Sequence, residues 1–189
     1  MKHALLFLML CFFSHASDAQ EIQVYFSPNG GCEEAVISKI NSAAKTIDIA
    51  MYYLSSANIA HALVRAQQRN AAIRIVLDQG QEIESASKSG YLIKHGFEIR
   101  YHLGFGLMHN KFAIIDGETL ITGSFNWTQT AQERNEENLL IIHDESTISQ
   151  YQQRFEYLWN TSRIDLRDAR GLAAAPAWVC TTFHLFCGH

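Results

Sequence analysis

The chain of 189 residues has little proline, no excess of positive charge and few long apolar runs. Two prolines and 11 glycines beside 48% hydrophobic residues exclude a collagen-like, low-complexity or mostly disordered chain. The formal net charge is −4, so we do not expect a generally basic surface that binds nucleic acids or membranes by charge alone. An anionic ligand would therefore need a locally positive site.

The longest apolar run lies at the start of the chain, where Lys2 precedes the stretch from Ala4 to Phe13. Small residues follow, and Ser17-Asp18-Ala19 matches a signal-peptidase site, with Ala16 as the second choice. A membrane-spanning helix needs about 20 apolar residues, so this run is short for an anchor. The sequence predicts a signal peptide over residues 1–19, cleavage near Ala19, and an exported protein, periplasmic or secreted, without stable membrane insertion.

Cysteine is also scarce, and the loss of Cys11 with the signal peptide would leave an odd number. In an oxidising compartment the simplest prediction is a disulfide between Cys180 and Cys187, with Cys32 unpaired. The same tail contains His184 and His189, but the spacing of these four residues matches no common zinc template. We therefore favour the disulfide over zinc and predict a C-terminal tail over residues 163–189 without an assigned role.

Apolar periodicity predicts one α/β domain over residues 20–162. Strands and helices alternate in its first half, whereas strands with short connections follow in the second. The expected strands are 22–26, 46–53, 73–77, 97–101, 111–115, 120–122 and 138–142, and the expected helices are 33–44, 59–70, 85–94 and 146–160. This order indicates a mixed, mostly parallel β-sheet flanked by helices.

Polar residues gather around one predicted hairpin. Asp116-Gly117 between two apolar runs is a strong signal for a two-residue turn, in which Lys111 would face Thr122 and His109 would face Ser124. In that register one face carries His109, Lys111, Thr122, Ser124 and Asn126, and the other carries Phe112, Ile114, Ile121 and Phe125. An imidazole, an ammonium and an amide on one face suit a phosphate or another anion. A longer turn would break this register.

The pattern His-x-Lys-x4-Asp followed by Gly-Ser-x-Asn resembles the motif of the phospholipase D superfamily, and most of all its small, single-motif Nuc-type endonucleases. Phe26-Ser27-Pro28, residues 47–52 and Glu136-Glu137-Asn138 extend the resemblance. It implies an α/β/α sandwich. The residue roles that it implies are a nucleophile at His109, phosphate ligands at Lys111 and Asn126, a supporting hydroxyl at Ser124, and an orienting carboxylate at Glu137. Asp116 completes the catalytic motif in a more structural than chemical role.

This chemistry needs a second imidazole, because one residue cannot act as nucleophile and general acid in the same step. No other histidine of the chain is followed two positions later by lysine. The resemblance implies a homodimer in which the two copies of His109 share one site. Lys111 already supplies positive charge there, so we expect neither a metal nor another cofactor.

The predicted function is a phosphodiesterase, foremost a non-specific endonuclease acting on DNA and possibly RNA through a phosphohistidine. One alternative is a phospholipase D-type hydrolase acting on phospholipid head groups. Another is a non-catalytic nucleic-acid-binding module, which would use base-stacking aromatic residues. Tyr52, Tyr53, Tyr101 and Trp127 could serve that purpose, but they fit the core or its rim equally well.

Overall fold

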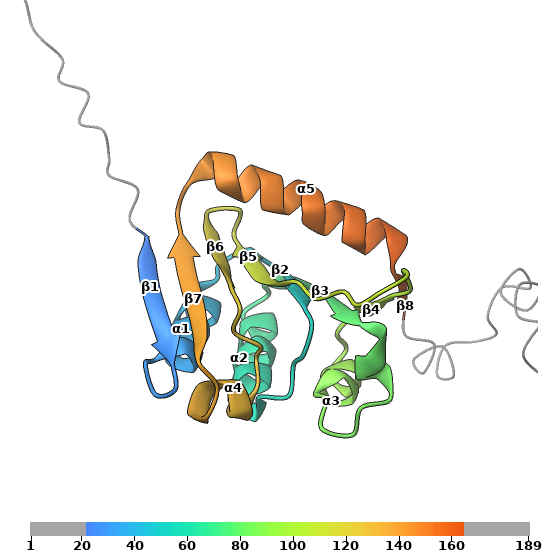
Figure 1. The fold of residues 1–189 in the computed structure, drawn as a ribbon. Coiled ribbons are helices and arrows are strands. Elements are labelled where there is room, and N and C mark those ends of the chain that lie inside the picture. The colour runs from blue at the N-terminus through green and yellow to red at the C-terminus, as the bar shows by residue number, and fades with distance from the viewer. Residues whose placement is uncertain (1–21, 165–189) are drawn as a thin grey trace, which may run out of the picture.

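Eight strands form one sheet, in the order β1-β7-β6-β5-β2-β3-β4-β8, in the computed structural model, which describes residues 22–164 (Figure 1). The strands are β1 (Gln23–Ser27), β2 (Thr46–Met51), β3 (Ala72–Asp78), β4 (Ile99–His102), β5 (Lys111–Ile115), β6 (Thr119–Gly123), β7 (Glu137–Ile142) and β8 (Arg163–Ile164). The predicted signal peptide and the Cys180–Cys187 pair lie outside the described residues, whereas Cys32 is buried with a free thiol.

The sheet is mixed, as expected, but it is not mostly parallel. Among the strands of residues 22–164, only β2 with β3 and β3 with β4 pair in parallel, and helices α2 and α3 make these crossovers. The other five pairs are antiparallel. Parallel neighbours need a long crossover connection, and the short connections of the second half do not provide one. The expected share of parallel pairs was therefore too large.

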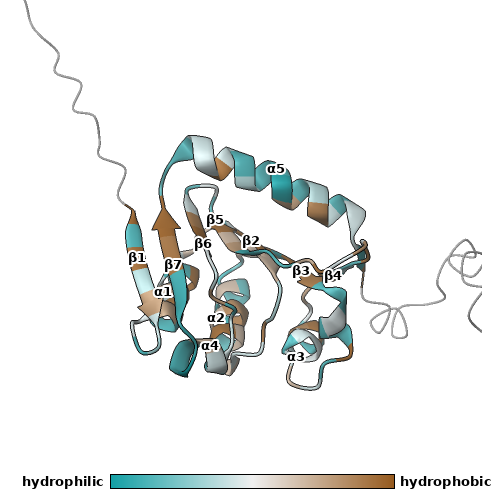
Figure 2. Cartoon of the chain, in the orientation of Figure 1, coloured by the Kyte–Doolittle hydropathy of each residue, from teal (hydrophilic) through white to brown (hydrophobic). Residues whose placement is uncertain are grey.

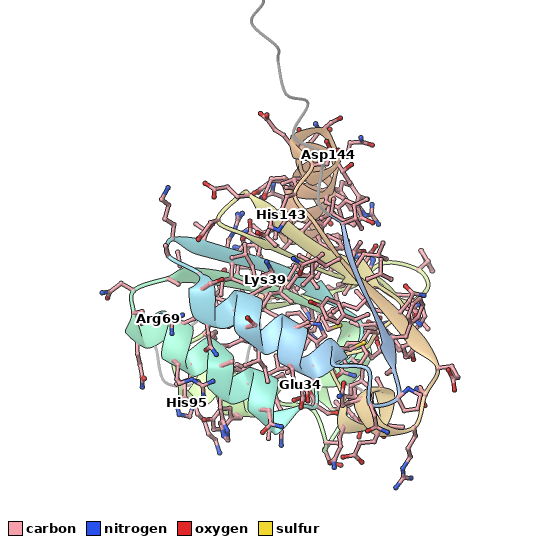
Figure 3. The ribbon with its side chains drawn as sticks, turned by 90° about the vertical axis from the view of Figure 1, so that its left-hand side faces the viewer. Glu34, Lys39, Arg69, His95, His143 and Asp144 are labelled. Carbon is pink, nitrogen blue, oxygen red and sulfur yellow. The ribbon has the colours of Figure 1, made fainter. Side chains whose placement is uncertain are left out.

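Helices cover both faces of this sheet, which gives the predicted α/β/α layers. They are α1 (Cys32–Ser42), α2 (Ala57–Gln68), α3 (Ser89–Lys94), α4 (Gln129–Glu133) and α5 (Glu145–Thr161), with a short 3-10 helix η1 (Gln79–Glu82). Figure 3 shows α1 and α2 side by side, where the Arg69 guanidinium donates to the carbonyls of Ile40 and Asn41. On the opposite face, α5 crosses the sheet alone (Figure 1). Of the described helices, none has the length and apolarity to span a membrane.

Two apolar clusters hold the layers together, one on each side of the sheet. The larger lies between the sheet and α1, α2 and α3, and the smaller lies under α5 around Phe112 and Phe155. Figure 2 shows the corresponding hydrophobic bands on strands and on the inner sides of helices. Arg74 ties α5 to β2 through Asp48 and Glu156. Both faces of the central strands are therefore buried, which explains their nearly continuous apolar sequence.

The β5–β6 hairpin has a three-residue loop, so the predicted register is wrong by one residue. Ile115 pairs with Thr119, and Phe112 pairs with Thr122. Asp116 and Gly117 do take positive φ, but Glu118 adds a third loop residue, and its N–H donates to the Ile115 carbonyl. The slip moves Thr122 to the face of α5, where its hydroxyl lies 3.3 Å from that of Tyr151.

Candidate active site

Four strand ends place the polar motif residues at one end of the sheet. β2 and β6 finish there, while the antiparallel β5 and β7 begin there (Figure 1). Lys111 opens β5 opposite Met51, and Glu137 opens β7 opposite Ser27. After β6 the chain turns towards the residues that follow β2, because the Trp127 carbonyl accepts from the N–H groups of Ser55 and Ser56. Residues far apart in the sequence thereby converge.

His109, Lys111 and Tyr52 form the centre of this arrangement. The His109 imidazole is exposed, and its ring centre lies 4.4 Å from that of Tyr52. The buried Lys111 ammonium lies 5.0 Å from the same tyrosine ring and donates to the His109 carbonyl at 2.9 Å. Tyr52 therefore packs against the imidazole and the cation at once. From the sequence alone Tyr52 fits a base-stacking role and the core or its rim equally well, although its place directly after the buried strand β2 could have indicated a site residue.

The charge of Lys111 is partly balanced by a carboxylate of β7, which is separated from β5 by β6. Burial lowers the pKa of Lys111 below its usual value, and the negative charge of Glu137 raises it in part. A buried cation of this kind gains from an anionic ligand, which would restore the solvation that burial removes. The site thus carries one buried positive charge next to one exposed imidazole.

Glu137 itself is held by polar neighbours. Its carboxylate oxygens accept from the Ser124 hydroxyl and, at 3.1 Å, from the Asn135 amide. The Ser124 hydroxyl in turn accepts from the Asn138 N–H at 3.1 Å. Gly123 makes this approach possible, because a Cβ there would lie 2.2 Å from the Asn138 carbonyl oxygen. Ser124 is therefore occupied in positioning Glu137, and the predicted orientation of His109 by Glu137 remains a prediction.

In the described part of the chain, Asn126 has a buried polar atom without a partner at this end of the sheet. Its Oδ1 is buried and has no hydrogen-bond partner within residues 22–164. Trp127 next to it is fixed by its N–H bond to the Tyr53 carbonyl at 3.0 Å. A buried carbonyl oxygen without a partner is costly, so such an acceptor is often retained for a donor on a ligand. The structure therefore brings His109, Lys111, Ser124, Asn126 and Glu137 to the same end.

Asp116 lies at the other end of β5, away from these residues. Its carboxylate accepts from the backbone N–H groups of Ala44, Lys45 and Thr46 at 2.7 to 2.8 Å. Burial raises the pKa of Asp116, but the three N–H donors outweigh that effect and hold it below its usual value. The side chain fastens the β5–β6 loop to the start of β2, which is the structural role that the resemblance implied.

Replacing Asp116 with asparagine is expected to lower the free energy of unfolding by about 2 kcal/mol, because charge-assisted bonds to backbone donors are lost. A lowered pKa means that the stabilisation is present at neutral pH and disappears as the pH falls through that pKa. Urea unfolding at pH 7 and at pH 3 would measure both effects, with Glu118→Gln in the same loop as the control. Equal loss of stability at the two pH values would contradict this account.

A bound metal ion would be another source of positive charge at such a site. Between residues 22 and 164, no group of three or more histidine, cysteine, aspartate or glutamate side chains could hold a metal ion. The positive charge of this end of the sheet comes instead from Lys111. Independence from metals and cofactors stays a prediction.

Comparison with known families and structures agrees with this geometry. The family described as "Cardiolipin synthase, PLD-like domain" matches residues 36–159. Nuc from Salmonella typhimurium, a phospholipase D family member, superposes with a TM-score of 0.73 at 31% identity, covering 77% of this chain and 98% of that one. NucT from Helicobacter pylori gives the same TM-score at 25% identity, covering 77% of this chain and 99% of that one.

Similar sequences point to the same group. Phospholipase D of Rickettsia conorii is 35% identical over 135 residues, which are 71% of this chain and 68% of that protein. Mitochondrial cardiolipin hydrolase of Xenopus tropicalis is 35% identical over 117 residues, 62% of this chain. The match spans 56% of the length of that hydrolase. With the family match over most of the described residues and the motif residues at one end of the sheet, the chain belongs to the phospholipase D superfamily.

Proposed function

We propose that the chain is a phosphodiesterase, foremost an endonuclease that hydrolyses DNA and RNA without a metal ion. The observation that carries the proposal is the convergence of an exposed imidazole, a buried lysine and a half-buried amide at one end of the sheet. This chain covers Nuc and NucT almost entirely. Their similarity supports nucleic acid over phospholipid as the substrate.

The proposed reaction has two displacements. In the first, a neutral ring nitrogen of His109 attacks phosphorus, the bond to the leaving oxygen breaks, and the His109 imidazolium of a second subunit protonates that oxygen. In the second, the same partner imidazole takes a proton from water, whose oxygen attacks phosphorus and displaces His109. Lys111 and Asn126 bind the non-bridging phosphate oxygens in both steps. Ser124 and Glu137 position this pocket.

A homodimer with one shared site supplies the second imidazole in this proposal. In the part of the chain that the structure describes, the other histidines lie outside the motif, and His143, for example, contacts Thr119 and the Glu118 carbonyl. Two-fold symmetry would bring two copies of each phosphate ligand together. The doubled Lys111 would make the shared site positive although the chain is acidic overall.

The direct test is hydrolysis by the purified protein in EDTA, with single-stranded DNA, double-stranded DNA, RNA, and vesicles of phosphatidylcholine or cardiolipin as substrates. Cleavage of nucleic acid by the wild type but not by His109→Ala supports the proposal. Hydrolysis of lipid alone would favour a phospholipase, and binding of nucleic acid without hydrolysis would make the chain a binding module. Activity that EDTA abolishes and a divalent metal restores would overturn the metal-free mechanism.

The lipid substrate stays the second candidate because one feature of the fold favours it. The segment before His109 exposes Leu103, Phe105 and Leu107. The relatives named cardiolipin hydrolase and phospholipase D make the same substrate class plausible for this chain.

The pH dependence of phosphate binding should follow Lys111. Because burial lowers its pKa, competitive inhibition by inorganic phosphate should weaken on the alkaline side at a lower pH than an ordinary lysine would give. Glu137 raises that pKa, so Glu137→Gln should move the alkaline limb to still lower pH. The inhibition constant measured from pH 6 to pH 11 tests both expectations. Glu98→Gln, at an exposed pair with Arg100, is the control. An alkaline limb that Glu137→Gln leaves in place would contradict the assignment.

A further inference from the structure

The connection between β4 and β5 carries an exposed apolar tip directly before the site. Leu103, Phe105 and Leu107 are 50%, 112% and 63% exposed, with Gly104 and Gly106 between them. From Leu103 to Leu107 the sequence contains no charged or hydrogen-bonding side chain. Large apolar side chains grouped on a surface commonly mark a contact with another molecule or a membrane.

The base of this apolar tip is held firmly, so its exposure is a feature of the fold. The buried Asp78 carboxylate, at the end of β3, accepts from the Met108 N–H at 2.9 Å. On the other side, a Cβ at Gly104 would lie 2.3 Å from the His102 ring, so the backbone passes close to that ring. Met108 is buried, whereas the next residue, His109, is exposed. The bond to Asp78 fixes the end of the tip one residue before His109.

We propose that Leu103, Phe105 and Leu107 enter the acyl region of a lipid bilayer and dock the protein with His109 facing the head-group phosphates. Side chains of this kind enter an interface by roughly 5–10 Å, which is the depth that separates acyl chains from phosphates. His109 follows the tip by two residues, so a docked tip places the imidazole at the level of phosphodiesters. Docking itself does not depend on the reaction. That docking would help the protein to hydrolyse lipid rests on the proposed function.

A bilayer fits the apolar tip better than a second protein surface does. The three large side chains alternate with glycines, so the segment offers few other side chains to a complementary protein surface. Acyl chains need no such complementarity, because they rearrange around whatever enters them. The chain also lacks the excess of positive charge that would attract anionic lipids, which is consistent with apolar docking. The chain carries a net charge of −4. Binding should therefore be apolar, occur on zwitterionic lipid, and resist salt.

The test is flotation of the purified protein with phosphatidylcholine vesicles at low and high salt. Phe105→Ser and Leu107→Ser should each weaken binding about tenfold, since each removes one large apolar side chain from the bilayer. Phe105→Trp should retain binding. Val24→Ser is the matched control, because Val24 is also 51% exposed but lies on β1, at the opposite edge of the sheet. Binding by the wild type that high salt abolishes would overturn apolar docking.

Two further measurements on the same variants test whether the apolar tip binds a second subunit or nucleic acid instead of a bilayer. Light scattering after gel filtration should give Phe105→Ser the same mass as the wild type, and conversion to a lower mass would assign the tip to a subunit contact. Cleavage of single-stranded DNA without vesicles should also be unchanged, and its loss would assign the tip to nucleic acid. Vesicle binding unaffected by both serine variants would overturn the docking proposal.

A small chromogenic phosphodiester distinguishes failure of docking from failure of the proposed function. If Phe105→Ser hydrolyses it like the wild type and both fail to bind vesicles, docking is wrong and the chemistry stands. If the wild type binds vesicles through the apolar tip but hydrolyses no phosphodiester, docking stands and the proposed function is wrong.

Discussion

Replacing His109 with alanine is expected to lower turnover of a phosphodiester by at least about a thousandfold and to leave phosphate binding within a few fold of the wild type. The substitution removes the nucleophile, whereas the Lys111 ammonium and the Asn126 amide keep their places. Lys111 donates to the backbone carbonyl of residue 109, so its position does not require the imidazole. Chemistry and binding should therefore separate in this variant.

Two measurements check the expected loss at His109. Steady-state kinetics with a chromogenic phosphodiester give turnover, and inhibition by inorganic phosphate or direct calorimetry gives binding. Rapid base quenching with labelled substrate should trap a phosphoenzyme in the wild type, because phosphohistidine survives base, and none in His109→Ala. His143→Ala is the matched control, since His143 is also exposed but lies after β7, at the other end of that strand (Figure 3). Normal turnover in His109→Ala would remove this site from the reaction.

Local patterns were sufficient to predict most elements of the fold. Apolar spacing located the strands and long helices to within a few residues, because each packs one or both faces into a continuous core. The elements missed were short ones: η1, α4 and β8. α4 depends on its Thr128 cap, and β8 depends on pairing with β4, to which its residues are remote in sequence. The parallel share of the sheet was overestimated, since pairing between distant strands leaves little trace in either strand alone.

The motif predicted which residues converge in the candidate site, but the sequence did not predict the strand register that brings them together. The motif identified His109, Lys111, Ser124 and Asn126, and the structure gathers all of them at one sheet end. Asp116-Gly117 correctly indicated positive φ, yet loop length depended on Glu118 and on amides of residues 44–46 that bind Asp116. That partnership spans about 70 residues, so no local rule reveals it. The contact of Tyr52 with both His109 and Lys111 was missed for the same reason.

Mixing wild-type subunits with an excess of His109→Ala subunits should lower activity per wild-type subunit. With a tenfold excess and complete exchange, only about one partner in eleven is wild type, so activity per wild-type subunit should fall about tenfold. The physical reason is that a shared site needs one imidazole as nucleophile and the other as acid, and a mixed dimer has only one. Co-refolding of tagged and untagged chains, followed by the chromogenic assay, measures the effect.

An excess of His143→Ala subunits is the control for this mixing experiment, because mixed dimers then keep both copies of His109 and should remain fully active. Independent sites would instead leave activity per wild-type subunit unchanged at every ratio. Dilution offers a second readout: below the dissociation constant of the dimer, activity per subunit should fall with concentration. A fully active monomer would contradict the shared site, since the described part of one chain places only one motif imidazole beside Lys111.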